Sequence, residues 1–173
     1  MQRVFGIAGW SGSGKTTLIT KLIPELVGRG MRVSTIKHAH HLFDVDKPGK
    51  DSHVHREAGA TEVLISSVHR WALMHENRGA PEPSLAELVA KLAPVDLVLI
   101  EGFKFGEHRK LEVHRPLVGK PLLAATDPAV VAIASDETIP EARVPVLPID
   151  DIRSIGDLVV AASGLAQRVP RGR

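Results

Sequence analysis

A glycine-rich stretch near the amino terminus constrains the fold of this 173-residue chain more than any other feature. Residues Gly9–Thr17 read GWSGSGKTT and fit the phosphate-binding pattern G-x-x-x-x-G-K-[ST] at every fixed position. The apolar run 4–8 precedes the stretch as an expected strand, and residues 18–23 follow it with apolar side chains at helical spacing. In that setting backbone N–H groups of the loop and of the helix amino terminus point at phosphate oxygens. The chain is therefore predicted to bind a nucleoside triphosphate, with Lys15 reaching the β- and γ-phosphates and the Thr16 hydroxyl ligating Mg²⁺.

A second motif lies in the middle of the chain. Four apolar residues, 97–100, form an expected buried strand that ends in Glu101 and Gly102. An acidic residue at the carboxyl end of such a strand is typical of the site that holds Mg²⁺ or orients the attacking water in phosphate chemistry. Glu101 is accordingly predicted to act beside the phosphate loop.

A loop rich in histidine and aspartate follows the expected strand Val33–Lys37. Residues 38–52 show no sustained period and contain Pro48-Gly49, so they are predicted to be irregular. Loops at the carboxyl ends of parallel strands border the ligand crevice, so Lys37 and one of the loop aspartates are expected to meet the γ-phosphate and Mg²⁺. The histidines leave an alternative open, a transition-metal site. That site would draw on His38, His40, His41, His53 and His55.

The remaining pattern predicts a mostly parallel, twisted α/β sheet flanked by helices. Two β-rich runs, 62–66 and 70–75, are expected to form an extra hairpin that serves in dimerisation through the region of Trp71, because hairpin strands need an edge partner. Ser84 and Glu87 match a capping box at the start of a helix over 85–92. Further strands are expected at 111–114, 122–125, 130–134 and 144–147, with helices at 55–60 and 152–162. A single domain is predicted over residues 1–164, with a disordered basic tail over 165–173.

Charge and composition narrow the possible partners. The chain has 22 Lys and Arg against 20 Asp and Glu, but three of the arginines lie in the last six residues, so the body is nearly neutral. Aromatic residues make up only 3%, which leaves little material for stacking bases, and nucleic-acid binding is not expected. No apolar run is long enough for a membrane span, and there is no cysteine. No leader is expected before the first strand. A cytoplasmic location is expected.

Taken together, these segments resemble a known family. The phosphate loop, Ile36–His41, Asp44–Ser52, Ala58–Ala60, Arg70–Met74 and Leu99–Lys104 look like the molybdopterin-guanine dinucleotide biosynthesis adapter family, MobB. The phosphate loop alone is unspecific, and the histidine- and aspartate-rich loop makes the match specific. The resemblance covers roughly residues 3–160.

The resemblance implies a fold, a ligand and a partner. The fold is that of the P-loop NTPases, and the protein is expected to be a homodimer that binds GTP and Mg²⁺ and hydrolyses GTP slowly at most. Its expected role is to assist the guanylyltransferase MobA, which joins GMP to molybdopterin. Phosphates would be held by Gly12, Ser13, Gly14, Lys15, Thr16 and Thr17, and Mg²⁺ by Thr16 and Glu101. The γ-phosphate or cofactor side would be lined by Lys37, His38, Asp44, Asp46 and Asp51.

The base and the reaction are left open by the motifs. No N-K-x-D guanine motif is present, and Asp127, after the expected strand 122–125, is the candidate for a base-reading acid. A small-molecule kinase is one alternative, with Arg109 and Lys110 as cations over the transferred group. A metal carrier switched by nucleotide, using the histidine loop, is the other.

Overall fold

The computed structural model describes residues 2–39 and 43–165, which form two compact units. Of these residues, the first unit comprises 2–38 and 88–165, and the second comprises 39 and 43–87. The prediction of one domain over 1–164 is not tested by this division and stays a prediction. No helix among the described residues is long and apolar enough to span a membrane.

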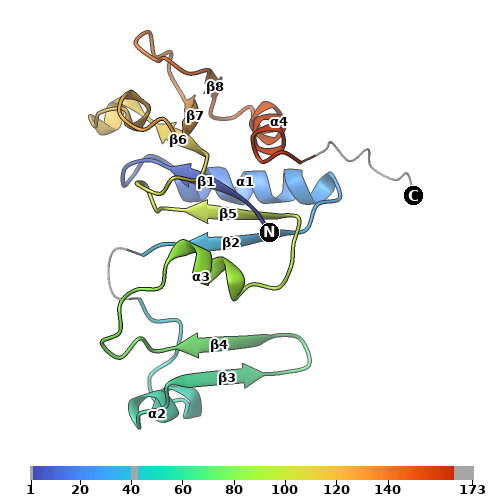
Figure 1. Ribbon diagram of the computed structural model, residues 1–173, viewed down its shortest axis with the longest axis vertical. Coiled ribbons are helices and arrows are strands. Elements are labelled where there is room, and N and C mark those ends of the chain that lie inside the picture. The colour runs from blue at the N-terminus through green and yellow to red at the C-terminus, as the bar shows by residue number, and fades with distance from the viewer. Residues whose placement is uncertain (1, 40–42, 166–173) are drawn as a thin grey trace. The chain divides into compact units, whose positions relative to one another are not determined.

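The first unit is built on a six-stranded sheet in which every neighbouring pair is parallel (Figure 1). The order is β2-β5-β1-β6-β7-β8. The strands are β1 (Arg3–Ala8), β2 (Val33–Lys37), β5 (Leu97–Glu101), β6 (Lys110–His114), β7 (Val130–Ser135) and β8 (Val146–Pro148). The predicted parallel α/β sheet is confirmed. Because the chain moves from β1 to β2 in one direction and from β5 to β6 in the other, the carboxyl end of β1 is a topological switch point, where ligands bind in open α/β sheets.

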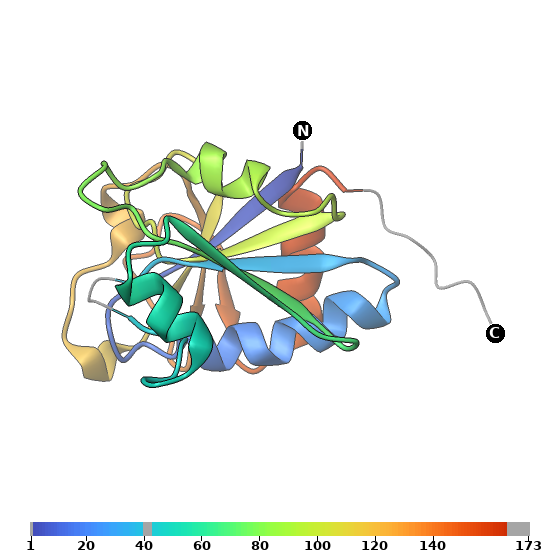
Figure 2. The same ribbon diagram turned by 90° about the horizontal axis from the view of Figure 1, so that it is seen from below.

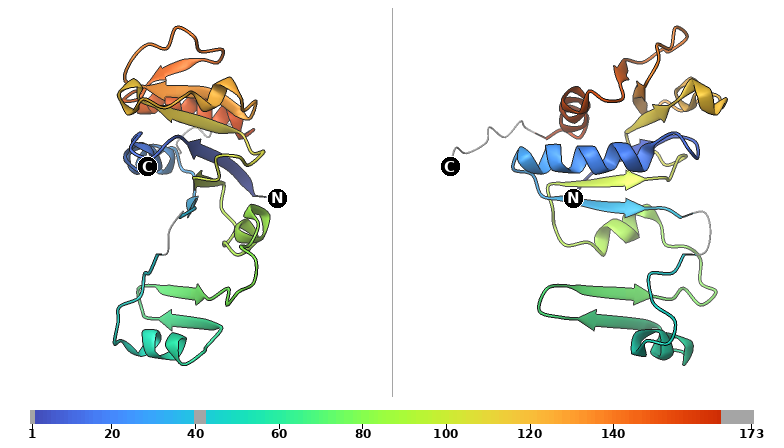
Figure 3. Two further views of the ribbon diagram at one scale, coloured as in Figure 1. Left: turned by 90° about the vertical axis from the view of Figure 1, so that its left-hand side faces the viewer. Right: turned by 180° about the vertical axis from the view of Figure 1, so that it is seen from behind.

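Two helices cover one face of this sheet, α1 (Lys15–Gly28) and α4 (Ile152–Ala162), as the rear view in Figure 3 shows. Leu18, Leu22 and Leu26 of α1 pack with Phe5 and Ile7 of β1 in the main core. These apolar residues recur at helical spacing on α1 and at alternate positions on β1, so each element turns one face inward. The core fixes where α1 begins, and that beginning carries the phosphate loop.

Several shorter elements complete the chain. They are α2 (Asp51–Glu57), β3 (Glu62–Ser66), β4 (Trp71–His75), α3 (Leu85–Ala90) and the 3₁₀ turns η1 (Pro116–Val118) and η2 (Leu123–Ala125). The antiparallel hairpin of β3 and β4 is confirmed. Figure 2 shows the two strands along their length, with α2 beside them. The helix predicted over 55–60 instead starts at Asp51. The capping box is confirmed, since Ser84 N donates to Glu87 Oε2 at 2.8 Å and Glu87 N to Ser84 Oγ at 3.3 Å.

One predicted strand is wrong. Residues 122–125 do not pair with the sheet, and Leu123–Ala125 form the turn η2. The cause is the buried Glu112 of β6, whose two carboxylate oxygens accept the N–H groups of Leu123 at 2.9 Å and Ala124 at 2.8 Å. A carboxylate that binds two successive amides favours a turn over an extended strand, because it bonds N–H groups that a strand would point to opposite sides.

Candidate functional site

The phosphate loop leaves β1 in a shape that requires glycine. Gly9 has a φ of 143°, and a Cβ at this position would lie 2.4 Å from Val113 O on the neighbouring strand. Gly14 caps α1 in the left-handed region, with a φ of 98°. The first turn of α1 holds no acidic residue, so nothing negative competes for its amide groups. Ser13 lies inside the loop, 2% exposed, and its Oγ has no hydrogen-bond partner among the described residues.

Lys15 crosses the mouth of this loop. Its Nζ donates a hydrogen bond to Trp10 O at 2.8 Å, which keeps the ammonium beside the N–H groups that would receive phosphate. The pKa of Lys15 lies below its ordinary value, mainly because of burial. The Glu101 carboxylate opposes this shift, and the cations Lys104 and Lys37 add to it. Three lysines therefore surround the loop within electrostatic reach of one another, which makes this edge strongly attractive to a polyanion.

Thr16, Lys37 and Glu101 meet at the same place, although 85 residues separate Thr16 from Glu101. The Thr16 hydroxyl donates to Glu101 Oε1 at 2.8 Å, and Lys37 Nζ lies 3.6 Å from the same oxygen. The pairing of β2 with β5, which sets Lys37 opposite Glu101, and of β5 with β1 brings them together. The predicted cluster of Lys15, Thr16, Lys37 and Glu101 at one sheet edge agrees with this geometry.

His38 joins this edge through its backbone and ring. Its N–H donates to Glu101 O at 2.8 Å, and its ring packs against that of Phe103, tilted by 37° with the ring centroids 4.5 Å apart. Gly102 makes that approach possible, since a Cβ there would lie 2.9 Å from His38 Cβ and its φ is 97°. His38 thus helps to fix the chain around Glu101.

The donor set fits a magnesium nucleotide. Mg²⁺ prefers oxygen ligands and is commonly held by one or two protein oxygens together with substrate phosphates. The Thr16 hydroxyl and the Glu101 carboxylate supply such oxygens beside the loop. The Ser13 Oγ, which has no partner in the part of the chain that the structure describes, and the amino end of α1 supply donors for phosphate.

Arg115 is a further cation at the loop. The guanidinium lies 3.5 to 3.9 Å from the position a Cβ would take on Gly14. Its Nε is buried with no hydrogen-bond partner among the described residues, and its Nη1 lies 3.6 Å from Asp136 Oδ2. In the sequence Arg115 stood out only as part of a general cationic segment. Its place at the carboxyl end of a buried strand was the signal that could have singled it out.

Three predicted residues, Asp44, Asp46 and Asp51, belong to the second unit, where Asp44 and Asp46 have hydrogen-bond partners. Asp44 accepts two hydrogen bonds from Arg56, at 3.0 and 2.6 Å, and these bonds lower the pKa of Asp44 to about 2. Asp46 Oδ1 accepts from Ser52 Oγ at 2.8 Å, and Asp51 lies in the first turn of α2. Their approach to a γ-phosphate stays a prediction.

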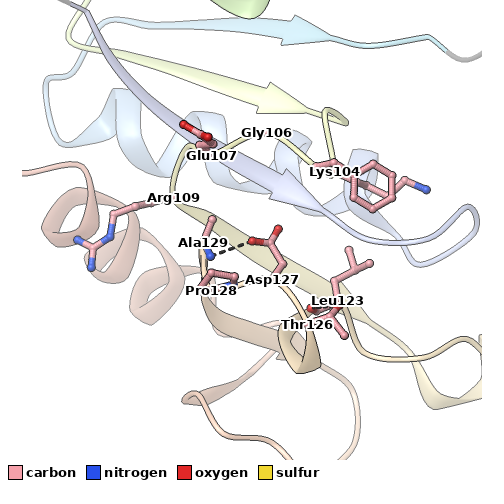
Figure 4. A pocket seen from close by; sticks show the side chains of 10 residues that line it. Lys104, Gly106, Glu107, Arg109, Leu123, Thr126, Asp127, Pro128 and Ala129 are labelled. Carbon is pink, nitrogen blue, oxygen red and sulfur yellow. Dashed lines mark hydrogen bonds between the residues drawn. The ribbon is translucent and has the colours of Figure 1, made fainter.

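Asp127 was predicted to follow a strand over 122–125. In the structure it follows the turn η2 and lies just before the amino end of β7. Its Oδ2 accepts from the fully buried Lys110 Nζ at 2.8 Å. Its Oδ1 accepts from Ala129 N at 2.9 Å, as Figure 4 shows. Burial raises the pKa of Asp127, but the hydrogen bonds from Lys110 and Ala129 and the nearby positive charge together outweigh it, and the pKa lies below its ordinary value. Both oxygens already have protein donors, so these contacts argue against a base-reading role.

The histidine loop gains no support as a metal site. His40 and His41 lie outside the described residues, and within 2–39 and 43–165 no three His, Asp or Glu side chains gather as a metal-binding group. The cations proposed for a kinase are also engaged elsewhere. Arg109 Nη1 donates to Ala162 O at 3.3 Å, and Lys110 is buried against Asp127.

The parallel sheet, the glycine loop at its switch point and the Lys15–Thr16–Glu101 cluster define the P-loop NTPase class of fold. The family model for molybdopterin guanine dinucleotide synthesis protein B (MobB) matches residues 4–136. The chain belongs to this family.

Individual relatives agree. A molybdopterin-guanine dinucleotide biosynthesis adapter protein of Escherichia coli is 44% identical over 160 residues, covering 91% of each chain. Its counterpart in Haemophilus influenzae is 43% identical, covering 90% of this chain and 86% of the relative. A crystal structure of molybdopterin-guanine biosynthesis protein B superposes with a TM-score of 0.72 at 26% identity, over 91% of this chain and 98% of the other.

Proposed function

We propose that this protein binds GTP with Mg²⁺ and acts as an adapter in the synthesis of molybdopterin guanine dinucleotide, assisting the guanylyltransferase MobA. The observation that carries the nucleotide part is the hydrogen bond between Thr16 and Glu101 at the mouth of the phosphate loop, with Lys15 and Lys37 beside it. The adapter role is supported by the family and by the names of the E. coli and H. influenzae relatives.

In this proposal each group has one task. The N–H groups of the loop and the Lys15 ammonium bind the phosphates, and Thr16 and Glu101 hold Mg²⁺, which neutralises charge on the β- and γ-phosphates. Glu101 accepts a hydrogen bond from Thr16 and pairs with Lys37, so in this proposal it binds Mg²⁺ and does not activate an attacking water. GTP hydrolysis by the isolated protein is therefore expected to be slow. Molybdopterin and MobA are the proposed further partners, in the cytoplasm.

We also propose that the protein is a homodimer formed through the hairpin of β3 and β4. On one face of the hairpin, Leu64 pairs with Leu73 and lies 60% exposed, and Trp71 lies 66% exposed beside them. The opposite face carries Val63, which is buried in the second unit. A two-stranded sheet is marginal alone and leaves strand edges to be paired, so a second copy of the hairpin is the proposed occupant.

The proposal is tested by calorimetric titration of GTP and ATP, each with Mg²⁺, into wild type and Lys15→Ala. We expect GTP to bind more tightly than ATP, and Lys15→Ala to weaken binding by about 100-fold or more, since it removes a charge-assisted contact with the phosphates. Lys91→Ala, which removes an exposed lysine before β5, is the control and should bind as wild type does. Equal or tighter binding of ATP would contradict the guanine preference, and transfer of labelled γ-phosphate to a small acceptor would favour a kinase instead.

A further inference from the structure

The phosphate site leaves only one direction for the nucleoside. The groups that serve the γ-phosphate and Mg²⁺ are Thr16, Glu101 and Lys37, and they lie toward β5 and β2. The sugar and base, at the other end of the triphosphate, are then directed along the carboxyl edge of the sheet toward β6, β7 and β8. Ligands of open α/β sheets follow this edge.

A groove lies at that end of the edge. It follows the carboxyl ends of β7 and β8, with a volume of about 420 Å³. Ile139, Pro140, Leu147 and Pro148 supply apolar walls, which suit the faces of a flat aromatic ring. Asp136, Glu137 and Thr138 are its exposed polar lining residues. Of these, Asp136 lies beside Arg115 and is 39% exposed, so its carboxylate can accept bonds from the edge of a ring.

Arg115 links this groove to the phosphate loop. Its guanidinium lies within 4 Å of the Cβ position of Gly14 on one side and its Nη1 lies 3.6 Å from Asp136 Oδ2 on the other. The groove therefore begins one side chain away from the amino end of α1. The buried Nε of Arg115, which has no hydrogen-bond partner among the described residues, is a donor that a phosphate or sugar oxygen on this path would satisfy.

We propose that this groove holds the guanine base and that Asp136 is the residue that reads it. Guanine presents two adjacent donors, N1–H and the 2-amino group, which match the two oxygens of a carboxylate. Adenine presents an acceptor at N1 and no 2-amino group, so Asp136 would face a lone pair and lose both bonds. The inference rests on the proposed GTP binding and places guanine recognition at the carboxyl end of β7, away from Asp127.

Xanthine makes the test specific, because it carries a 2-oxo group where guanine carries the 2-amino group. An asparagine can accept from N1–H and donate to the 2-oxo oxygen, so Asp136→Asn should invert the preference. We expect wild type to bind GTP at least tenfold more tightly than XTP, and Asp136→Asn to bind XTP at least tenfold more tightly than GTP, roughly the discrimination of one matched hydrogen bond over one mismatch. Glu137→Gln removes the same charge one residue further along the same groove and should leave the order of wild type unchanged.

Inosine triphosphate tests the same contact without a variant, since hypoxanthine lacks only the 2-amino group. Titrated into wild type with Mg²⁺, it should bind about tenfold more weakly than GTP. If GTP binds in a Lys15-dependent way but inosine triphosphate binds equally well, or Asp136→Asn keeps the preference for GTP, the base lies elsewhere and the inference is wrong while the proposed function stands. An inverted preference in Glu137→Gln would also overturn it. If wild type binds no GTP, the proposed function is wrong, and the inference, which depends on it, is wrong as well.

Discussion

At the scale of single residues, Glu101 Oε1 accepts a hydrogen bond from Thr16 and forms an ion pair with Lys37. Replacing Glu101 by Gln keeps the shape of the side chain but removes the charge that a cation needs. In wild type, Mg²⁺ is expected to tighten GTP binding. In Glu101→Gln that gain should shrink by about tenfold or more, because the remaining amide is a weak ligand for a hard cation.

The measurement is a pair of titrations of GTP, one with Mg²⁺ and one with EDTA, for each protein. Glu107→Gln is the control, because its side chain is exposed on the loop after β5 and should not alter the effect of Mg²⁺. An undiminished effect of Mg²⁺ in Glu101→Gln would show that the cation is held by other groups.

Gly102 allows a second test at this scale. A methyl group there would lie 2.9 Å from His38 Cβ, on a residue with a φ of 97°. Gly102→Ala should therefore lower the free energy of unfolding by about 1–3 kcal/mol and displace Glu101 from Thr16, which weakens nucleotide binding. Gly28→Ala is the matched control: it lies in α1 with open space around it, and it should leave stability unchanged or raise it by up to about 1 kcal/mol. Chemical denaturation compares the two, and equal stabilities would contradict the expected strain.

At the scale of elements, β6 is unusual because one of its faces buries charges. Lys110 is fully buried and holds the preceding loop, donating to Lys104 O and Gly106 O as well as to Asp127. Asp127→Ala leaves this ammonium without its counter-charge and should destabilise the protein by about 3 kcal/mol. Lys110→Met should cost less, because Asp127 is partly open to water and keeps its bond from Ala129.

The same pair predicts a pH dependence. The pKa of Asp127 lies below its ordinary value of 3.8, so the pair contributes its full stability above that value and loses it as the pH falls through the lower folded pKa. The difference in unfolding free energy between wild type and Asp127→Asn should therefore narrow as the pH is taken below about 4. Urea denaturation at a series of pH values measures it, with Glu107→Gln as the control. A constant difference down to pH 2 would contradict the assigned pairing.

How far the sequence predicted these elements depends on how local their causes are. The strand 97–100 with Glu101, and the phosphate loop with α1, are coded by contiguous residues and were predicted. The turn at Leu123–Ala125 was not, because its amides bind Glu112 of β6, a contact between segments. The burial of Lys110 was missed for the same reason, since its partner Asp127 lies 17 residues away. Arg115 carried a local signal, its place at the end of a strand, but the pairing of β6 with β1 is what brings it beside Gly14.

At the scale of the whole molecule, the second unit has a small share of the buried apolar residues. Val63 is its one member among the described buried hydrophobic residues, whereas Leu64, Ile65, Trp71 and Leu73 of the hairpin are exposed. Leu64, Leu73 and Trp71 share one face of the hairpin, and their apolar surface is favourable to cover, at about 25 cal/mol per Å². A second copy can cover it and pair the strand edges in the same step.

Trp71→Arg is expected to convert the dimer into a monomer, because it places a charge on the apolar face that also carries Leu64 and Leu73. Leu117→Arg is the matched control: Leu117 is 95% exposed in η1, outside the hairpin, and its variant should remain dimeric. Sedimentation velocity over a range of protein concentrations measures the mass of each. Binding of GTP to the monomeric variant should be unchanged, because the phosphate loop and the groove of Asp136 both belong to the first unit. A Trp71→Arg protein that stays dimeric would assign the interface to another surface, and a wild-type monomer at high concentration would exclude the homodimer itself.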